Sequence, residues 1–391
     1  MFLGRLHMAA FAALVSSSLF GCGVKQQPDT QGSATGEADQ GSGSGTTTGF
    51  RVTELVTDAT DPDLLNPWGL VGAEGVFWIA DNHTGKVSVY DGDGKTSDEY
   101  PTGRFSLGEG ITGVAALEGD EEETPTGDTD TEPTTSESEE PFLVDTGPEC
   151  AVDRSPAEFV FASEEGKLIA INDDTPIEGV TVVDSSADHA VYLGVAKVDM
   201  PSGPALLAAD FANARIDVFD GEFKKVKAGS AFVDPQMPEG WGPFNVMAID
   251  ETVYVAEAKI GPDGDEDAGP GLGAVALFDE SGAMIGRIKN DLFNAPWGVA
   301  VAGSESDMCE MDVARTLFIG NFGDGRITQF DADTLEPIGQ LADKTGKPIE
   351  LEGLWGITMG SDEAGDEDAL YFAQGPDDEA GGVFGRIDRE E

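Results

Sequence analysis

Short hydrophobic runs alternate with turns rich in Gly, Asp and Asn along most of the chain. One pattern recurs: a basic residue, an aliphatic residue, any residue, two apolar residues, and then Asp or Asn. Its copies read KVSVYD (86–91), KLIAIN (167–172), RIDVFD (215–220) and RITQFD (326–331), while AVALFD (274–279) and VFGRID (383–388) keep most of it. Runs of this length between turn residues are typical of β-strands.

Two further hydrophobic runs precede each copy. The nearer run ends in a small and then a polar residue: FWIAD, VFAS, LLAAD, YVAE, FIGN and YFAQ. The farther run reads PWGLV, ITGVAAL, YLGVAKV, PFNVMAI, PWGVAVA and LWGITMG. The chain therefore repeats a three-strand unit six times. Such repeats are typical of propellers, whose blades are four-stranded sheets around a central channel. The sequence predicts an all-β, six-bladed β-propeller.

Residues 50–59, FRVTELVTDA, precede the first unit and have no third-strand partner of their own. We expect this N-terminal strand to join the last blade as its outer strand, because closing the ring removes an open sheet edge. In the repeated Trp-Gly phrase, Gly lets the innermost strand crowd its neighbours and Trp fills the wedge between blades. This structural interpretation is favoured, and a binding role for the same tryptophans stays open.

The first residues do not fit the repeat. Arg5 and the apolar stretch MAAFAALVSSSLF predict a cleaved signal over residues 1–21, since the stretch is too short to span a bilayer. The following LFGC resembles a bacterial lipobox, so we expect Cys22 to be lipid-modified. Residues 22–49 would then be a flexible Gly/Ser/Thr linker. The alternative is an ordinary secretory signal with an incidental cysteine.

The propeller domain is predicted over residues 50–391. We expect the protein to lie outside the cytoplasm at the bacterial cell envelope, and to contact the membrane only through the lipid anchor. The formal net charge of −53 argues against nucleic acid and anionic lipid as partners. Cations, basic partners or plain solubility fit this charge.

The acidic insertion 118–149 is expected to be disordered. Cys150 and Cys309 are predicted to form a disulfide, which an oxidising compartment permits. We expect a monomer.

Several phrases together resemble a family of secreted bacterial six-bladed β-propellers. They are NPWGL, VFWIADNHTGKVSVYDGDG, NAPWGVA, LFIGNFGDGRI, LWGI and GPDDEAGGVFGRI. The resemblance covers about residues 50–391 outside the acidic insertion, and it implies the fold and an exported location. It implies no activity and no catalytic residue. More distantly the chain is similar to NHL-type and lactonase-type propellers, of which the second group binds a divalent cation at the channel mouth.

The second strands end in residues that should form a polar ring near one mouth of the channel: Asp81, Ser163, Asp210, Glu257, Asn321 and Gln374. Oxygen donors of this kind suit Ca²⁺. One hypothesis is therefore a calcium site at Asp81, Asp210, Glu257 and Asn321. The alternative is that Asp81 and Asp210 only brace their hairpins through Lys86 and Arg215.

Two classes of function follow. The first is a binding module without a required cofactor, which holds a small molecule, a carbohydrate or a protein through residues near the mouth: Asn66, Trp68, Asn245, Asn294, Trp297 and Trp355. The second is a metal-dependent hydrolase of lactonase type, in which a cation polarises a carbonyl. Beyond the signal the histidines are His83 and His189, too few for a multi-histidine metal site. The sequence favours binding and assigns no catalytic residue.

Overall fold

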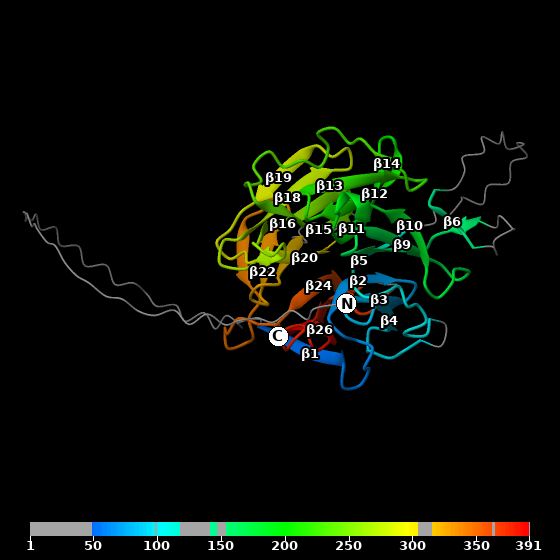
Figure 1. The fold of residues 1–391 in the computed structure, drawn as a ribbon. Coiled ribbons are helices and arrows are strands. Elements are labelled where there is room, and N and C mark those ends of the chain that lie inside the picture. The colour runs from blue at the N-terminus through cyan, green and yellow to red at the C-terminus, as the bar shows by residue number, and fades with distance from the viewer. Residues whose placement is uncertain are drawn as a thin grey trace, which may run out of the picture. The chain divides into compact units, whose positions relative to one another are not determined.

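The computed structural model describes residues 49–97, 100–117, 141–146, 154–303, 315–361 and 364–390. Within them, six antiparallel sheets are arranged as a β-propeller, and a separate two-stranded sheet adds to these six (Figure 1). One short 3-10 helix, Ser186–Asp188, accompanies the strands. The predicted fold class is therefore confirmed. Among the described residues no helix is long and apolar enough to cross a membrane.

The predicted three-strand units appear as the inner three strands of each blade. The innermost strands are β2 (Pro67–Ala73), β5 (Ile111–Ala116), β11 (Tyr192–Met200), β15 (Trp241–Ile249), β20 (Pro296–Ala302) and β24 (Leu354–Met359). The second strands are β3 (Val76–Asp81), β8 (Phe159–Ser163), β12 (Gly203–Asp210), β16 (Thr252–Ile260), β21 (Thr316–Asn321) and β25 (Leu370–Gln374). The third strands are β4 (Lys86–Tyr90), β9 (Lys167–Ile171), β13 (Arg215–Asp220), β18 (Gly273–Asp279), β22 (Ile327–Asp331) and β26 (Val383–Glu390).

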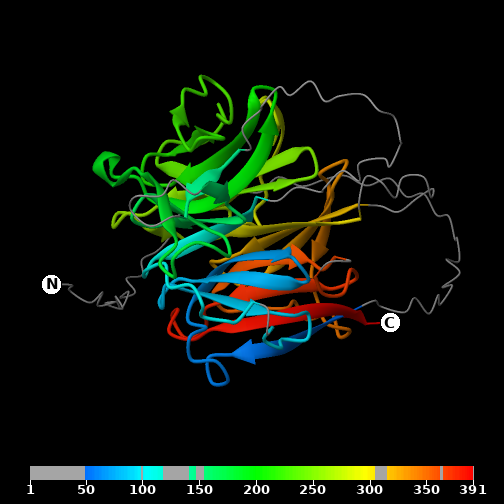
Figure 2. The ribbon, with the colours of Figure 1, turned by 90° about the vertical axis from the view of Figure 1, so that its right-hand side faces the viewer.

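The N-terminal strand closes the ring as the sequence predicts. In the last blade the outer strand is β1 (Gly49–Thr57), which pairs antiparallel with β26 from Gly49↔Glu390 onward. Figure 2 shows this blue strand beside the red C-terminal strand. The other outer strands are β10 (Val180–Asp184), β14 (Lys225–Val226), β19 (Met284–Ile288) and β23 (Pro337–Gln340). In the described part of blade 1 no fourth strand forms. Val87 of β4 instead makes backbone hydrogen bonds with Gly103 and Phe105.

One register repeats in all six blades. In five blades the last residue of the second strand pairs with the first or an early residue of the innermost strand, as in Pro67↔Asp81 and Pro296↔Asn321, and a register shift follows. In blade 4 the equivalent pair is Pro243↔Glu257. The six positions at the register shift are thus structurally equivalent, although β16 continues three residues beyond Glu257. Asn245, by contrast, is not at a strand start beside Asn66 and Asn294, because it lies inside β15.

A ring of close backbone contacts joins the innermost strands. At Gly69 an added Cβ would lie 2.5 Å from the Thr112 carbonyl oxygen, and at Gly356 2.6 Å from the Trp68 carbonyl oxygen. Neighbouring blades can approach this closely only because the side chain is absent. Similar contacts occur at Gly113, Gly194 and Gly298. In blade 4 Asn245 takes the glycine position, and its Nδ2 donates to the Trp297 carbonyl oxygen at 2.8 Å, bridging to blade 5.

Part of the acidic insertion is ordered, so the prediction of disorder over 118–149 is wrong for residues 141–146. There β6 (Leu143–Asp145) pairs with β7 (Arg154–Pro156). Phe142, directly before β6, and Val144, within it, are each 2% exposed, because they pack into the core of blades 2 and 3. Residues 118–140 and 147–149 lie outside the described residues. So do the signal, residues 22–48, and the three cysteines Cys22, Cys150 and Cys309.

Candidate functional site at the channel mouth

Aromatic side chains close the central channel. Trp68 and Trp355 stack with ring centroids 3.6 Å apart, and Trp297 packs edge-on against both at 6.3 Å and 5.8 Å. Phe244 and Leu193 complete a buried cluster that we call the tryptophan plug. It draws residues from blades 1, 3, 4, 5 and 6, so it fills the axis. The cavity lined by the glycine ring and Asn245 is about 10 Å³, room for about one water molecule.

The three tryptophans therefore pack against one another at the axis rather than in separate wedges between blades. Trp355 is fully buried, and its indole Nε1 donates to Asn66 Oδ1 at 3.0 Å. Phe322 stacks on its other side at 4.1 Å. The indole N–H groups of Trp68 and Trp297 have no hydrogen-bond partner within the described ranges. The three tryptophans of the predicted binding set thus form a buried floor at the mouth. Asn245 lies among the innermost-strand glycines instead, and Asn294 bonds to Gly269 and Asn321.

Asn66 is the centre of a polar network above this floor. It is fully buried and has a left-handed backbone, with φ of 47°. Its Nδ2 lies 3.5 Å from Asn82 Oδ1, 3.4 Å from His83 Nε2 and 3.5 Å from Glu379 Oε2. Asn82 in turn donates to Glu164 Oε2 at 3.5 Å. One chain of contacts therefore links the loops of blades 6, 1 and 2.

Blade 4 adds a further acid to this region. Glu266 lies on β17 (Glu266–Asp267), which pairs with the end of β16. Burial raises the pKa of Glu266 to about 7, and the negative charge of Glu379 contributes to the rise. Loops from blades 2, 4 and 6 thus each bring a glutamate, Glu164, Glu266 and Glu379, to the surroundings of the plug. Sequence reasoning missed all three, because each lies in an acidic turn with nothing local to distinguish it from a solvated one.

The ring residues predicted to bind calcium each have partners in their own blades. Asp81 is fully buried and accepts a hydrogen bond from Ser88 Oγ at 2.6 Å, while burial raises its pKa well above the ordinary range. Lys86 pairs with Asp63 at 2.6 Å instead of with Asp81. Asp210 does pair with Arg215, at 3.1 Å, so the bracing alternative is correct for this hairpin alone.

Glu257 and Asn321 are also engaged. Glu257 Oε2 accepts from Arg287 Nη2 at 2.8 Å, and Arg287 also pairs with Asp234. The pKa of Glu257 is raised to about 8, mainly by burial and to a lesser extent by the negative charge of Asp234. Asn321 bonds to the backbone of Asn294 and Leu292. Across the described part of the chain, no three His, Cys, Asp or Glu side chains group in a way that could hold a metal ion.

Comparisons with known proteins support the fold. No protein-family model matches the chain. Two uncharacterised proteins of Acanthamoeba polyphaga mimivirus are similar to it. One is 26% identical over 354 residues, 85% of this chain and 77% of the relative. The other is 27% identical over 357 residues, 85% of this chain and 82% of the relative.

Two solved structures from Bacteroides thetaiotaomicron have similar folds. A protein of unknown function gives a TM-score of 0.53 at 11% identity, covering 88% of this chain and 76% of its own. An auxiliary nutrient binding protein gives a TM-score of 0.53 at 7% identity, covering 88% and 77%. At such low identity the likeness is one of fold alone.

Proposed function

We propose that the protein is a binding module, which holds a ligand over the tryptophan plug. The observation that supports this most is the strained turn beside the plug. Asp377, Asp378 and Glu379 follow one another with left-handed φ values of 59°, 53° and 66°. This conformation costs an L-residue roughly 1–2 kcal/mol, so three in succession persist only where the surroundings fix them. Strain of this kind clusters at binding sites.

The ligand that fits this mouth carries positive charge. Glutamates from three blades surround it, and Phe322 and Ile260 are partly exposed beside the plug. Burial of Glu266 disfavours its charged form, and a nearby cation restores that form. A ligand with a cationic group and an apolar stem therefore matches both the negative charge of the glutamates and the apolar surface of the tryptophan plug. The nutrient-binding propeller from Bacteroides thetaiotaomicron indicates that this fold accommodates binding.

Titration calorimetry with spermidine tests the proposal. We expect saturable binding that Glu379→Gln weakens about tenfold, the loss typical of one charged hydrogen bond. Glu251→Gln is the matched control, since it removes the same charge from the exposed turn between β15 and β16. The proposal is contradicted if spermidine does not bind, or if both variants weaken binding equally, which would indicate attraction to the acidic surface as a whole.

The metal-dependent hydrolase of lactonase type is the second candidate. The observation in its favour is Asp81 Oδ1, which is buried and has no partner among the described residues. If Ca²⁺ binds at the ring, the melting temperature should rise with the logarithm of free calcium. Glu257→Gln should then reduce that rise more than Lys86→Ala. A melting temperature that calcium leaves unchanged would exclude the ring site and the hydrolase that depends on it.

We also propose that the module is extracytoplasmic and attached to the envelope through Cys22. The support is the LFGC sequence after an apolar stretch and before a Gly/Ser/Thr-rich segment. Cys22→Ser should move the protein from the membrane fraction to the soluble fraction. A native protein that is already soluble and unacylated would contradict this.

The predicted disulfide between Cys150 and Cys309 follows from the same location. Alkylation of the unfolded, unreduced protein should leave both thiols unmodified, as read by intact mass. Modification of both thiols before reduction would refute the pairing.

A further inference from the structure

A second cavity lies between blades 3 and 4, and no residue of the tryptophan plug lines it. Its volume is about 300 Å³, at the lower end of the range for small-molecule sites. Arg215, Asp217 and Lys225 of blade 3 line one wall, and Asp234 and Glu257 line the other. Most of the remaining lining is apolar, including Ile216, Val226, Ala228, Phe232, Met237 and Phe278. The cavity thus has a charged part and an apolar part.

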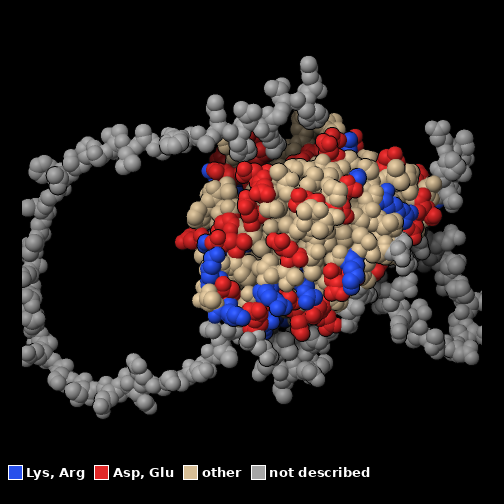
Figure 3. Space-filling view, turned by 90° about the horizontal axis from the view of Figure 1, so that it is seen from below, with Lys and Arg blue, Asp and Glu red and all other residues tan. Residues whose placement is uncertain are grey.

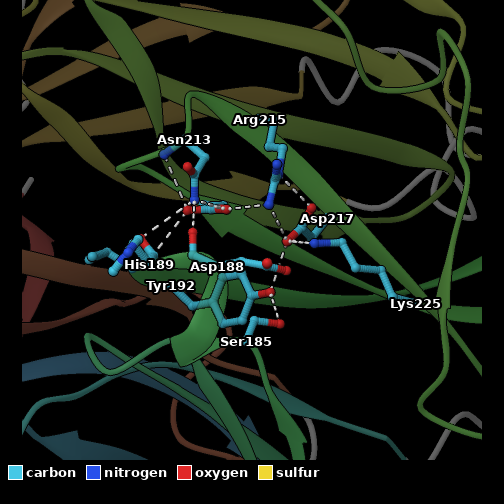
Figure 4. Close-up of polar contacts among 10 residues, drawn as sticks. Ser185, Asp188, His189, Tyr192, Asn213, Arg215, Asp217 and Lys225 are labelled. Atoms are coloured by element: carbon cyan, nitrogen blue, oxygen red, sulfur yellow. Dashed lines mark hydrogen bonds and ion pairs between the residues drawn. The ribbon is translucent and has the colours of Figure 1, made fainter.

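On the blade 3 wall, cationic groups keep unused hydrogen-bond donors. Arg215 donates through Nε to Asp217 at 2.8 Å, and its Nη2 contacts Asp217 and Asp210 (Figure 4). Within the described ranges its Nη1 has no partner. Lys225 Nζ donates to Asp217 Oδ2 at 2.5 Å, which uses one of its three N–H groups. Both side chains are partly exposed, at 44% and 38%. Free donors therefore remain on both.

The carboxylates around the cavity are already engaged. Asp217 Oδ2 accepts from Lys225 and also from the Tyr192 hydroxyl at 2.8 Å, and its Oδ1 accepts from Arg215. On the other wall Asp234 accepts from the Gln236 backbone N–H and from Arg287. Glu257 also accepts from Arg287. The site offers donors to a ligand more readily than acceptors, so it suits a group that accepts hydrogen bonds.

The charge balance of the cavity leads to the same conclusion. The whole chain has 75 acidic and 22 basic residues, and acidic side chains spread over much of the face in Figure 3. The cavity lining instead holds two bases, Arg215 and Lys225, beside the three acids Asp217, Asp234 and Glu257. The partners behind the lining, Arg287 and Asp210, bring these counts to three and four. The ratio of bases to acids is thus higher at the cavity than over the whole chain, so an anion is repelled less strongly there.

We propose that this cavity binds a small monocarboxylate with a short aliphatic chain. The carboxylate accepts hydrogen bonds from Arg215 Nη1 and Lys225 Nζ, which Asp217 holds near each other. The aliphatic chain packs against the apolar side chains of the segment between Val226 and Met237 and against Phe278. No residue of the tryptophan plug lines this site, so it does not depend on the cation binding proposed over the plug.

Titration calorimetry with hexanoate, and with hexan-1-ol as its neutral counterpart, tests this proposal. We expect hexanoate to bind saturably and hexan-1-ol to bind at least about tenfold more weakly, as the loss of a charged hydrogen bond implies. Lys225→Gln should weaken hexanoate binding by about the same factor. Lys224→Gln is the matched control, because the adjacent Lys224 pairs with Glu222 at the exposed surface and does not line the cavity.

A second variant tests the proposal independently, in case Lys225→Gln does not fold. Ala228→Leu narrows the apolar part of the cavity, so it should weaken hexanoate binding while the charged wall stays intact. Glu379→Gln, which alters the channel mouth, should leave hexanoate binding unchanged. Three results would each overturn the proposal. They are equal binding of hexanoate and hexan-1-ol, unchanged binding in Lys225→Gln, and no saturation up to about 10 mM hexanoate, a concentration well above the Kd of a site with millimolar affinity.

Discussion

The junction between blades 6 and 1 and the junction between blades 3 and 4 occupy equivalent places in the ring, but different chemistry fills them. At the first, Phe77 packs against Tyr371 at 4.2 Å and Phe384 at 5.4 Å, and Tyr90 stacks on Phe384 at 5.7 Å. At the second, ion pairs around Arg287 and Asp217 surround a cavity, and much of the apolar contact comes from Val and Ala side chains.

This difference follows from what each junction has to do. Blades 6 and 1 meet where the ring is closed by β1, so their packing holds the ends of the domain together. Buried aromatic rings supply large apolar contact there without unsatisfied polar groups. At blades 3 and 4 the chain is continuous, and charged groups with spare donors are kept beside a cavity. We infer that the first junction contributes stability and that the second retains space for a ligand.

The largest effect should come from the aromatic junction. Phe384→Ala removes a fully buried ring that contacts Phe77, Tyr90 and Tyr371. The free energy of unfolding should fall by about 3–5 kcal/mol, as for other buried Phe→Ala changes. Urea unfolding measures this. Ile338→Ala is the control, since Ile338 is 61% exposed and should change stability by no more than about 0.5 kcal/mol. Equal losses in both variants would contradict the assignment.

The next effect concerns the charged junction. Arg287→Met leaves Asp234 buried without its cation and Glu257 without its hydrogen-bond donor, so stability at pH 7 should fall by roughly 3 kcal/mol. The double variant Arg287→Met/Asp234→Asn removes the acid that has lost its cation and should lose distinctly less. If the double variant is as unstable as the single one, the loss comes from packing of the Arg287 stem rather than from charge.

A smaller effect should appear as a pH dependence of that junction. The pKa of Glu257 rises in the folded protein from 4.5 to about 8. The folded state therefore holds a proton that the unfolded state has released, and this stabilisation is complete below pH 4.5 and lost as the pH rises to about 8. The loss is at most about 1.4 kcal/mol per pH unit for one proton.

The variant Glu257→Gln isolates this contribution. The difference in unfolding free energy between the wild type and Glu257→Gln should change in favour of the variant as the pH rises from about 5 to 8. Comparison with the variant cancels the general repulsion of an acidic chain. Parallel stability curves for the two proteins over this range would show that Glu257 does not titrate there.

Much of the fold could be predicted because it rests on local signals. The repeated runs give the strands of each blade, and the unpartnered segment at 50–59 gives the closing strand. Phe142 and Val144 were missed because a strongly acidic flank hides two apolar residues that a neighbouring core buries. A composition average over 118–149 cannot show such a short ordered hairpin.

The side-chain partners could not be predicted in the same way. Glu257 meets Arg287 across β18, and Asp234 reaches it from the loop before β15, so no short spacing reveals the network. Lys86 pairs with Asp63 from the preceding loop, although Asp81 is opposite it in the hairpin. Asn245 was predicted to be a binding residue near the mouth, but it takes the glycine position of the repeat, directly after Phe244, which stands where blades 1, 5 and 6 have Trp.

The smallest predicted effect tests the place where the ring departs from its glycine pattern. Asn245→Gly restores the residue type of the other five blades but removes the hydrogen bond from Nδ2 to the Trp297 carbonyl oxygen. Stability should fall by about 1 kcal/mol, because a buried carbonyl loses its partner and the space of the side chain is left beside the tryptophan plug. Thermal unfolding measures the change. If Asn245→Gly is instead more stable than the wild type, blades 4 and 5 close without the asparagine, and its bridge is not what joins them.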